Sequence, residues 1–376
     1  MSTKFTIPIF KLEFDDDYIE EFLECTDDIL RSGRPLAEGY YVKKFCDQFS
    51  VMNRSKFCTM VSNGTAALEL ALKALPVQGK VIIPTNTFFA TAVAVENSGN
   101  EILLADSNTK DFGISFEDIK KLSLENSDVI AVVVVHIGGI ISKDIFKIKE
   151  FCEREGIFLI EDAAHAHLSE LEGTCAGNFG DIGCFSLFPT KVMTSGEGGI
   201  VVTNNKELFD KILSLKNFGR DLTNSSICVL RGGSNYKVTE LQGLHAYLDL
   251  KRVIKRIFKR NELLSIYERT LDPDKFQVIK QSSGTCSYYK AIVRQINGID
   301  EDLEAKMKSR GVSMTGKVYG LPVHMQPAYR QTFNSFSYPV ADKFAMQHCC
   351  PPLYPELTPK EVQLIATIMN ELKNEK

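Results

Sequence analysis

The run at residues 129–136 constrains the fold more than any other part of the sequence. It reads VIAVVVVH and consists almost entirely of β-branched residues. A strand of this composition has no polar face to turn toward water, so it must be covered on both faces, as at the centre of a parallel sheet. The run therefore predicts an α/β fold in which helices cover both faces of a central sheet.

The neighbouring segments support this fold, because short apolar runs alternate with helical patterns. The pattern predicts strands at 58–61, 81–84, 101–106, 157–160, 182–187 and 199–203. It predicts helices at 66–75, 115–122, 142–155 and 207–215. Strands that alternate with helices in this way predict a mostly parallel sheet.

The chain after about residue 238 has a different pattern. A Thr-x-x-Gln capping box at Thr239 predicts the start of a long helix that reaches about Leu271. A strand at 288–294, a helix at 300–309 and a helix that begins at Thr358 predict a smaller α+β unit. We therefore expect two domains, residues 1–250 with an N-terminal lead-in and helix near 17–31, and residues 251–376. The basic segment 251–260 is expected to be a solvated helix face.

Composition excludes several classes of protein. The net charge of −4 and the lack of a long basic run argue against nucleic acid as a partner. The apolar runs are too short to span a bilayer, and the N-terminus lacks the apolar core of a secretory signal. The 10 cysteines are scattered rather than arranged as a disulfide framework. We expect a cytoplasmic protein that binds neither membranes nor nucleic acid.

Reactive side chains follow the ends of two predicted strands. The strand at 157–160 is followed by Glu161 and Asp162, and the strand at 182–187 holds Ser186 and leads to Lys191. Ligands of α/β proteins bind at the carboxyl ends of the strands. An acid, an alcohol and a lysine that meet there suit pyridoxal phosphate, which needs an amine, a partner for its ring nitrogen and a phosphate cradle.

A turn before the first predicted helix of the sheet is a second candidate site. It reads Ser62-Asn63-Gly64-Thr65. The N–H groups at a helix start have no partner within the helix and favour a phosphate. Ser, Asn and Thr are also ordinary capping residues, so these residues alone leave both interpretations open.

The ordered set of motifs resembles the DegT/StrS-type sugar aminotransferases, which are fold-type I pyridoxal-phosphate enzymes of the aspartate aminotransferase superfamily. The matching motifs are EDAAH at 161–165, GD at 180–181, FSLFPTK at 185–191 and GEGG at 196–199. The resemblance covers nearly the whole chain and is most specific from 62 to 199. It implies a large domain with a mostly parallel seven-stranded sheet and a smaller C-terminal α+β domain.

The resemblance also implies roles for individual residues. It implies a Schiff base between the cofactor and Lys191, a ring-nitrogen contact at Asp162 and a phosphate contact at Ser186. It further implies a homodimer with shared active sites, in which Asn235 of one subunit reaches the phosphate bound by the other. The remaining cofactor contacts that it implies are Asn63, Gly64 and Thr65 at the phosphate, Phe88 over the ring and His165 near the ring.

Several of these assignments have plain structural alternatives. Phe88 is expected to contact the ring, whereas its neighbour Phe89 is expected to be a core residue. Asn235 is also compatible with a simple turn, and His324 in the segment GLPVHMQP is equally compatible with substrate contact and with packing. Other candidates for binding a substrate phosphate or carboxylate are Arg220, Arg231 and Lys237. Asp162, His165 and His167 lack a further ligand cluster, so we predict no metal site.

These residues predict a pyridoxal-phosphate-dependent aminotransferase with a ping-pong mechanism, in which Lys191 acts as nucleophile and general base. The resemblance implies L-glutamate as donor and a nucleotide-linked keto-sugar for surface polysaccharide as acceptor. A small phosphorylated ketone such as dihydroxyacetone phosphate, used in capsule biosynthesis, is the alternative acceptor. Deoxygenating dehydratases of this fold carry histidine in place of the lysine, so Lys191 argues against them. Intact Lys191 and Asp162 argue against a non-catalytic binding protein, and no dinucleotide-binding glycine motif follows the first strand.

Overall fold

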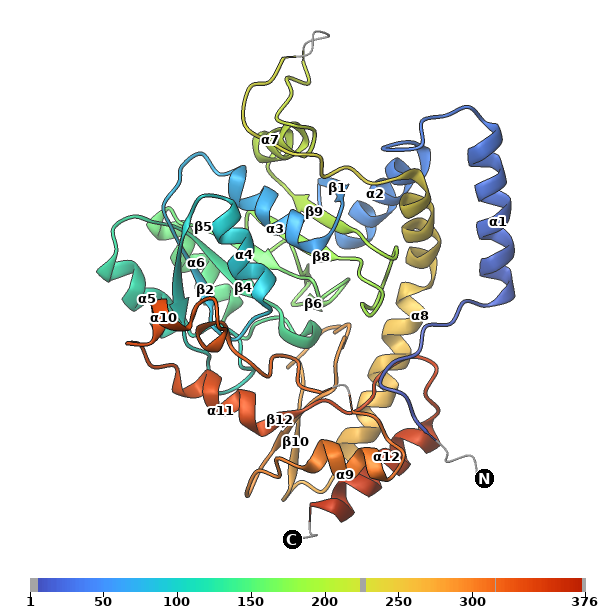
Figure 1. The fold of residues 1–376 in the computed structure, drawn as a ribbon, viewed down its shortest axis with the longest axis vertical. Helices are drawn as coiled ribbons and strands as arrows, with labels where there is room; N and C mark the ends of the chain where they lie inside the picture. The colour runs from blue at the N-terminus through green and yellow to red at the C-terminus, as the bar shows by residue number, and fades with distance from the viewer. Residues whose placement is uncertain (1–5, 224–227, 315, 374–376) are drawn as a thin grey trace.

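A seven-stranded sheet forms the centre of the larger domain. The computed structural model describes residues 6–223, 228–314 and 316–373. The strands lie in the order β1-β9-β8-β5-β4-β2-β3, and all are parallel except β9, which runs antiparallel to both of its neighbours (Figure 1). Their bounds are β1 Phe57–Val61, β2 Lys80–Pro84, β3 Glu101–Ala105, β4 Val129–Val135, β5 Phe158–Asp162, β8 Ile182–Ser186 and β9 Gly199–Thr203. This confirms the predicted mostly parallel seven-stranded sheet.

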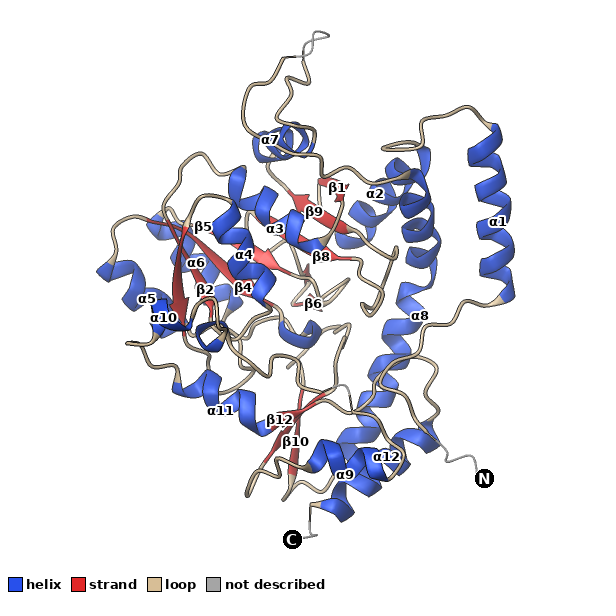
Figure 2. Ribbon diagram, in the orientation of Figure 1, coloured by secondary structure: helices blue, strands red, loops and turns tan. Residues whose placement is uncertain are grey.

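Helices cover both faces of this sheet, as Figure 2 shows. Along β4, Val132 and Val134 pack in a core with α2, α5, α6 and α8, whereas Ala131 and Val133 pack in a second core with α3, α4 and α7. Successive side chains of a strand point to opposite faces, so burial of both sets requires a helical layer on each side. The helices in this domain are α2 Tyr40–Asn53, α3 Gly64–Lys73, α4 Phe89–Asn97, α5 Phe116–Glu125, α6 Ile145–Glu155 and α7 Lys206–Lys216.

The smaller domain is built on a three-stranded antiparallel sheet in the order β10-β11-β12. The long helix α8, Glu240–Thr270, runs from the larger domain into it (Figure 1), so the predicted boundary at residue 250 falls inside this helix. Near the N-terminus, Ile7 pairs with Val312 and therefore lies on the smaller domain. The other elements of this domain are β10 Phe276–Ile279, β11 Ile292–Gln295, α9 Leu303–Ser309, α11 Pro339–Gln347, β12 His348–Cys349 and α12 Pro359–Leu372.

Shorter elements complete the chain. The predicted capping box at Thr239 is confirmed, with Gln242 as the reciprocal partner, and the helix predicted to begin at Thr358 also starts with a capping box, formed with Glu361. The helix predicted near 17–31 is α1, Asp16–Arg31. The remaining short elements are η1 Ile137–Gly139, β6 Glu170–Leu171, β7 Thr174–Cys175, η2 Val323–Met325 and α10 Arg330–Phe333. Within the described ranges, no helix combines the length and the apolar character that crossing a bilayer requires.

The structure corrects three expectations from the sequence. The helix α2 was not predicted, and the strand expected at 288–294 begins only at Ile292. Arg260, expected on a solvated face, is 4% exposed and donates hydrogen bonds to the carbonyl oxygens of Tyr288, Tyr289 and Leu353. Burial lowers the pKa of Arg260 to about 10, and the three carbonyls offset part of the cost of burying its charge. Neighbouring basic residues on α8 pair with acids, namely Lys251 with Glu21, Arg252 with Asp15 and Arg256 with Asp249.

Candidate active site

A cavity of about 660 Å³ lies at the carboxyl ends of β5 and β8, beside the start of α3. This is the edge of the sheet at which the sequence predicted chemistry. The cavity brings together most of the predicted cofactor residues, namely Asn63, Gly64, Thr65, Phe88, Asp162, His165, Ser186 and Lys191.

The start of α3 closely approaches the end of β8. Asn63 is the N-cap of α3, and its side chain accepts a hydrogen bond from the Ala66 N–H at 2.8 Å. A Cβ atom added to Gly64 would lie 2.8 Å from the Cβ of Ser186, so the approach requires glycine. Gly64 and Thr65 line the cavity, and N–H groups in the first turn have no partner within the helix. These N–H groups and the Ser186 hydroxyl form a cradle that suits a phosphate.

Asp162 ends β5 and is 6% exposed. Its carboxylate accepts hydrogen bonds from Thr91 Oγ1 at 2.9 Å and from the Ala164 N–H at 3.2 Å. Burial raises the pKa of Asp162, whereas the two hydrogen bonds and the nearby Lys191 lower it. A carboxylate held in this way is fixed in orientation, and it would favour the protonated form of a ring nitrogen placed beside it.

Lys191 lies in the turn after β8, and its side chain enters the same cavity half-buried. Its Nζ lies 4.5 Å from the centroid of the Tyr289 ring. Burial lowers the pKa of Lys191 to about 8, while Asp162 raises it and Lys290 lowers it further. A substantial fraction of the amine is therefore uncharged slightly above neutral pH, which is the form that acts as a nucleophile or base.

His165 is buried against Tyr289. The two rings stack with centroids 4.3 Å apart, and the Gly138 N–H donates a hydrogen bond to His165 Nδ1 at 3.3 Å. Tyr289 is itself held by a 2.9 Å hydrogen bond between its hydroxyl and Thr190 Oγ1. Burial lowers the pKa of His165 well below its usual value, so the ring is neutral at physiological pH.

The second acid of the motif, Glu161, does not enter the cavity. Adjacent residues of a strand point to opposite faces, so Glu161 points away from the side on which Asp162 lies. Glu161 Oε2 lies 2.9 Å from His136 Nε2, and the two carboxylate oxygens accept hydrogen bonds from the N–H groups of Gly177 and Gly180 at 2.7 Å each. Glu161 therefore holds the loop before β8 in place, which fixes the strand that carries Ser186.

The cavity lacks five of the residues that the sequence predicted for cofactor or substrate, among them Lys237, whose Nζ donates to Asn217 Oδ1 at 3.3 Å. Asn235, Arg220 and Arg231 do not line it. They belong to a hairpin-like arm beyond α7, at the top of Figure 1, in which Asn217 pairs with Asn235 and Arg220 pairs with Val229. His324 also lies outside. Its Nδ1 is 2.7 Å from Thr85 Oγ1 and its Nε2 is 3.0 Å from Asp342 Oδ1, a geometry that favours the packing alternative.

The two neighbouring phenylalanines are both at the surface. Phe88 lines the cavity and is 50% exposed, so its side chain is available to a bound ring. Phe89, which we expected in the core, is 48% exposed, and its ring lies 4.0 Å from that of Phe88 between centroids. The expectation for Phe89 was wrong, because this first residue of α4 is not among those that the helix buries.

Sequence reasoning missed the contribution of the smaller domain to the cavity. Tyr289 and Lys290 lie just before β11, and Lys317, Val318 and Tyr319 lie in the segment before η2. The strand predicted at 288–294 includes Tyr289 and Lys290 but gave only a weak indication that they line a cavity. No motif pointed to the second group. On the larger domain, sequence reasoning also missed Glu69, Glu197 and Tyr236, which line the cavity, and Thr91, which holds Asp162.

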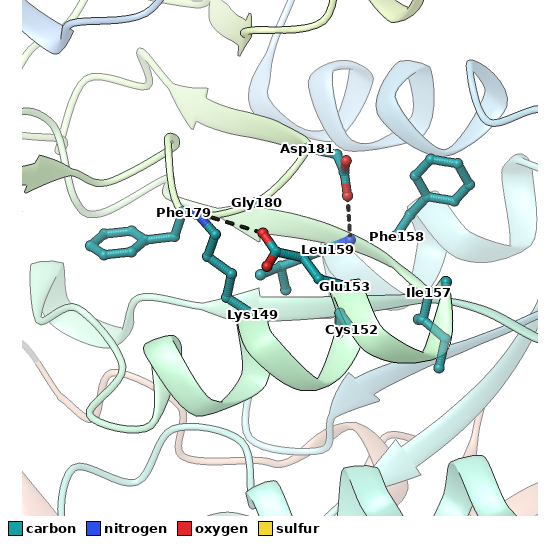
Figure 3. A pocket seen from close by; sticks show the side chains of 10 residues that line it. Lys149, Cys152, Glu153, Ile157, Phe158, Leu159, Phe179, Gly180 and Asp181 are labelled. Atoms are coloured by element: carbon teal, nitrogen blue, oxygen red, sulfur yellow. Dashed lines mark hydrogen bonds and ion pairs between the residues drawn. The ribbon is translucent and has the colours of Figure 1, made fainter.

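Two other features lie near the site without joining it. The ring nitrogens of the buried His167 have no hydrogen-bond partner within the described residues, and those residues contain no group of three or more potential metal ligands. A separate cavity of about 340 Å³ lies at the opposite end of β5, where Asp181 accepts a 2.8 Å hydrogen bond from the Leu159 N–H (Figure 3). None of the predicted site residues lines this second cavity.

Comparisons with known proteins agree with this geometry. The model of the DegT/DnrJ/EryC1/StrS aminotransferase family matches residues 16–370. GDP-perosamine synthase of Vibrio cholerae is 31% identical over 385 residues, which cover 98% of each chain. UDP-4-amino-4,6-dideoxy-N-acetyl-beta-L-altrosamine transaminase of Campylobacter jejuni is 28% identical over 354 residues, 90% of each chain.

A solved structure extends the similarity to the fold. NtdA of Bacillus subtilis, determined with its bound cofactor PMP, superposes with a TM-score of 0.89 at 24% identity, over 98% of this chain and 86% of its own. Aminotransferases of this family depend on pyridoxal phosphate, and the cavity described above has a cradle, a carboxylate and an amine that suit this cofactor. The chain therefore belongs to the DegT/DnrJ/EryC1/StrS aminotransferase family and is a pyridoxal-phosphate-dependent aminotransferase.

Proposed function

We propose that this aminotransferase moves an amino group from L-glutamate to the keto group of a nucleotide-linked sugar. The observation that carries the proposal is the meeting of Asp162, Lys191, Ser186 and the start of α3 in one cavity of about 660 Å³. The acceptor class is supported by the names of two relatives, which act on GDP- and UDP-linked sugars.

The residues of the large domain are placed to hold the cofactor. In this proposal Ser186 and the first-turn N–H groups of Gly64 and Thr65 bind the phosphate, and Asp162 pairs with the ring nitrogen. Phe88 and His165 lie against the ring. When bound, pyridoxal phosphate supplies an electron sink that weakens a carbon–hydrogen bond next to nitrogen.

Lys191 has two successive tasks in this proposal. Its Nζ would be the amine that holds the cofactor until a donor amine binds. Once free, the same Nζ would be the base that takes up and returns the proton of the donor carbon. A pKa of about 8 suits both tasks, because the uncharged amine is accessible near neutral pH and the protonated amine still holds a transferable proton.

We also propose a homodimer in which Asn235 and the arm with Arg220 and Arg231 serve the cavity of the second subunit. The proposal is supported by their position outside the cavity of their own chain, where Arg231 and Asn235 are exposed. A mixture of two variants tests it. Lys191→Ala and Asn235→Ala should each be impaired alone, whereas mixed dimers should regain activity at the one site that keeps both native residues. Lack of recovery in dimers confirmed by light scattering would contradict shared sites.

The absorbance spectrum of the purified protein loaded with cofactor tests the donor. Addition of L-glutamate should move the visible band to the shorter wavelength of the amine form. The aminated protein should then be offered GDP- and UDP-linked keto-sugars and dihydroxyacetone phosphate, with mass spectrometry of the products. Return of the visible band with a sugar nucleotide supports the proposal. Return with dihydroxyacetone phosphate alone would replace the acceptor, and no response to glutamate would reject the donor.

A further inference from the structure

The smaller domain contributes one wall of the cavity, formed by Tyr289, Lys290, Lys317, Val318 and Tyr319 and called here the small-domain wall. Its charged members are both lysines. The acids that line the cavity, Glu69, Asp162 and Glu197, all belong to the larger domain. The small-domain wall therefore presents positive charge to whatever enters the cavity, a property that suits an anionic guest.

The ammonium group of Lys290, like that of Lys191, has no ion pair and no hydrogen bond among the described residues and only approaches the Tyr289 ring. In the part of the chain that the structure describes, no acid lies within 4.0 Å of Lys290 Nζ and no hydrogen bond engages it. The side chain is half-buried, and burial lowers its pKa. Lys317, by contrast, is exposed, and its Nζ donates to the carbonyl oxygen of Met346 at 3.3 Å. An unpaired and partly desolvated ammonium is costly, and a bound anion would offset that cost.

The position of Lys290 indicates which anion fits. The Nζ atoms of Lys191 and Lys290 lie 4.5 Å and 5.2 Å from the centroid of the same Tyr289 ring. The charge of Lys290 also lowers the pKa of Lys191, so the two amines are near enough to interact, and an anion held by Lys290 would lie in the same part of the cavity as the carbon on which Lys191 acts. In an amino-acid donor, a carboxylate is bonded directly to that carbon. In a nucleotide sugar, several bonds of the sugar ring separate the phosphate from any ring ketone.

We propose that Lys290 binds the carboxylate attached to the reacting carbon of the amino donor. This inference rests on the proposed function for the identity of the donor. The cofactor phosphate is a less suitable partner, because its proposed cradle at Gly64 and Ser186 belongs to the lining that the larger domain contributes, called here the large-domain wall. Lys290 thereby sets the affinity for the donor, whereas Asp162 and Lys191 carry the reaction.

Binding of unreactive probes to the cofactor-loaded protein tests this inference. Glutarate, which is glutamate without its amino group, represents the donor, and inorganic pyrophosphate represents the acceptor. Isothermal titration should show glutarate binding weakened about 10- to 100-fold in Lys290→Gln, the range for loss of a charge-assisted hydrogen bond. Lys290→Arg should recover most of the loss because it keeps the charge. Lys343→Gln is the control, because Lys343 is exposed on α11 of the same domain and does not line the cavity, and it should bind glutarate like the wild type.

Kinetics give an independent readout. In Lys290→Gln the glutamate concentration for half-maximal absorbance change should rise by the same factor, with the maximal rate changed by less than about threefold, because the lost interaction is uniform binding. Lys290→Met is measured alongside, so that poor folding of one variant does not decide the outcome. Pyrophosphate binding should be unchanged in every Lys290 variant.

Three results would overturn the inference. Equal glutarate affinity in wild type and both uncharged variants would show that Lys290 binds no carboxylate. A loss confined to pyrophosphate would assign Lys290 to the acceptor phosphate instead. Weaker retention of the cofactor with unchanged glutarate binding would assign it to the cofactor phosphate. Because glutarate binding requires no turnover, these results are distinct from a failure of the proposed function, which appears in the wild-type response to glutamate.

Discussion

The two walls of the cavity differ in how their reactive side chains are held. On the large-domain wall, Asp162 ends a strand of the central sheet and is fixed by Thr91 and Ala164, and Gly64 lies against Ser186. On the small-domain wall, Lys290 lies outside regular structure and its ammonium has no fixed partner among the described residues. We infer from this difference that Asp162 and Ser186, which are proposed to hold the cofactor, are preorganised by the sheet, whereas Lys290, which is proposed to meet a changing substrate, keeps its bonding capacity free.

Removal of Lys191 should break the chemistry of the large-domain wall completely. Lys191→Ala deletes the proposed nucleophile and base, so the rate of the glutamate-driven absorbance change should fall about 10⁴-fold or more. Stopped-flow spectroscopy measures it, and Lys191→Arg serves as a control that keeps positive charge without a usable amine. Activity within tenfold of wild type in Lys191→Ala would show that the reaction does not depend on Lys191. The large-domain wall would then no longer be distinguished as the wall that carries the reaction.

Neutralisation of Asp162 should have the next largest effect. Asp162→Asn removes the charge that favours a protonated ring nitrogen, so the same half-reaction should slow about 10²- to 10³-fold. Asp181→Asn is a matched control, because Asp181 is also largely buried, accepts a backbone hydrogen bond from Leu159 and has a raised pKa, yet lines the second cavity. It should lower the melting temperature and leave the rate alone. Equal rate losses in both variants would indicate a general folding defect.

Crowding of the phosphate cradle should have a smaller effect. Gly64→Ala would place a methyl group 2.8 Å from Ser186 Cβ, so the start of α3 must shift. We expect the free energy of unfolding to fall by about 1–3 kcal/mol and the cofactor to bind about tenfold more weakly. Gly232→Ala, where an added Cβ meets nothing within 4 Å, is the control. Cofactor titration followed by fluorescence measures the cofactor affinity of both variants. Unchanged affinity in Gly64→Ala would exclude this cradle.

The pH dependence of cofactor capture should show the smallest effect and should link the two walls. An amine with a lowered pKa loses its proton at lower pH, so the rate at which the cofactor-free protein captures pyridoxal phosphate should rise with pH through about 8 rather than 10.5. The charge of Lys290 contributes to the lowering, so Lys290→Gln should move the midpoint to higher pH. Lys317→Gln should not. A midpoint that moves downward in Lys290→Gln would contradict the placement of Lys290 near Lys191.

The sequence predicted the large-domain wall because its determinants are local. The run at 129–136 indicates a central strand by composition alone, and Asp162 and Lys191 follow apolar runs that end at the same edge of a parallel sheet. The small-domain wall depends instead on tertiary packing. Lys290 and Lys317 are 27 residues apart in sequence, and neither belongs to a periodic pattern that indicates a shared cavity. No prediction covered the helix α2, Tyr40–Asn53, because we singled out no capping motif in this segment.

Arg260 connects the small-domain wall of the cavity to α8, a helix that does not line the cavity. Arg260 lies on α8, and its guanidinium donates hydrogen bonds to the carbonyl oxygens of Tyr288 and Tyr289, immediately before Lys290. It also donates a hydrogen bond to the carbonyl oxygen of Leu353. The same helix packs into the core of the larger domain through Val253 and Ile257, so α8 connects the two walls of the cavity. Changes along α8, outside the cavity lining, are therefore expected to move the main chain that carries Tyr289 and Lys290, and with it the proposed donor site.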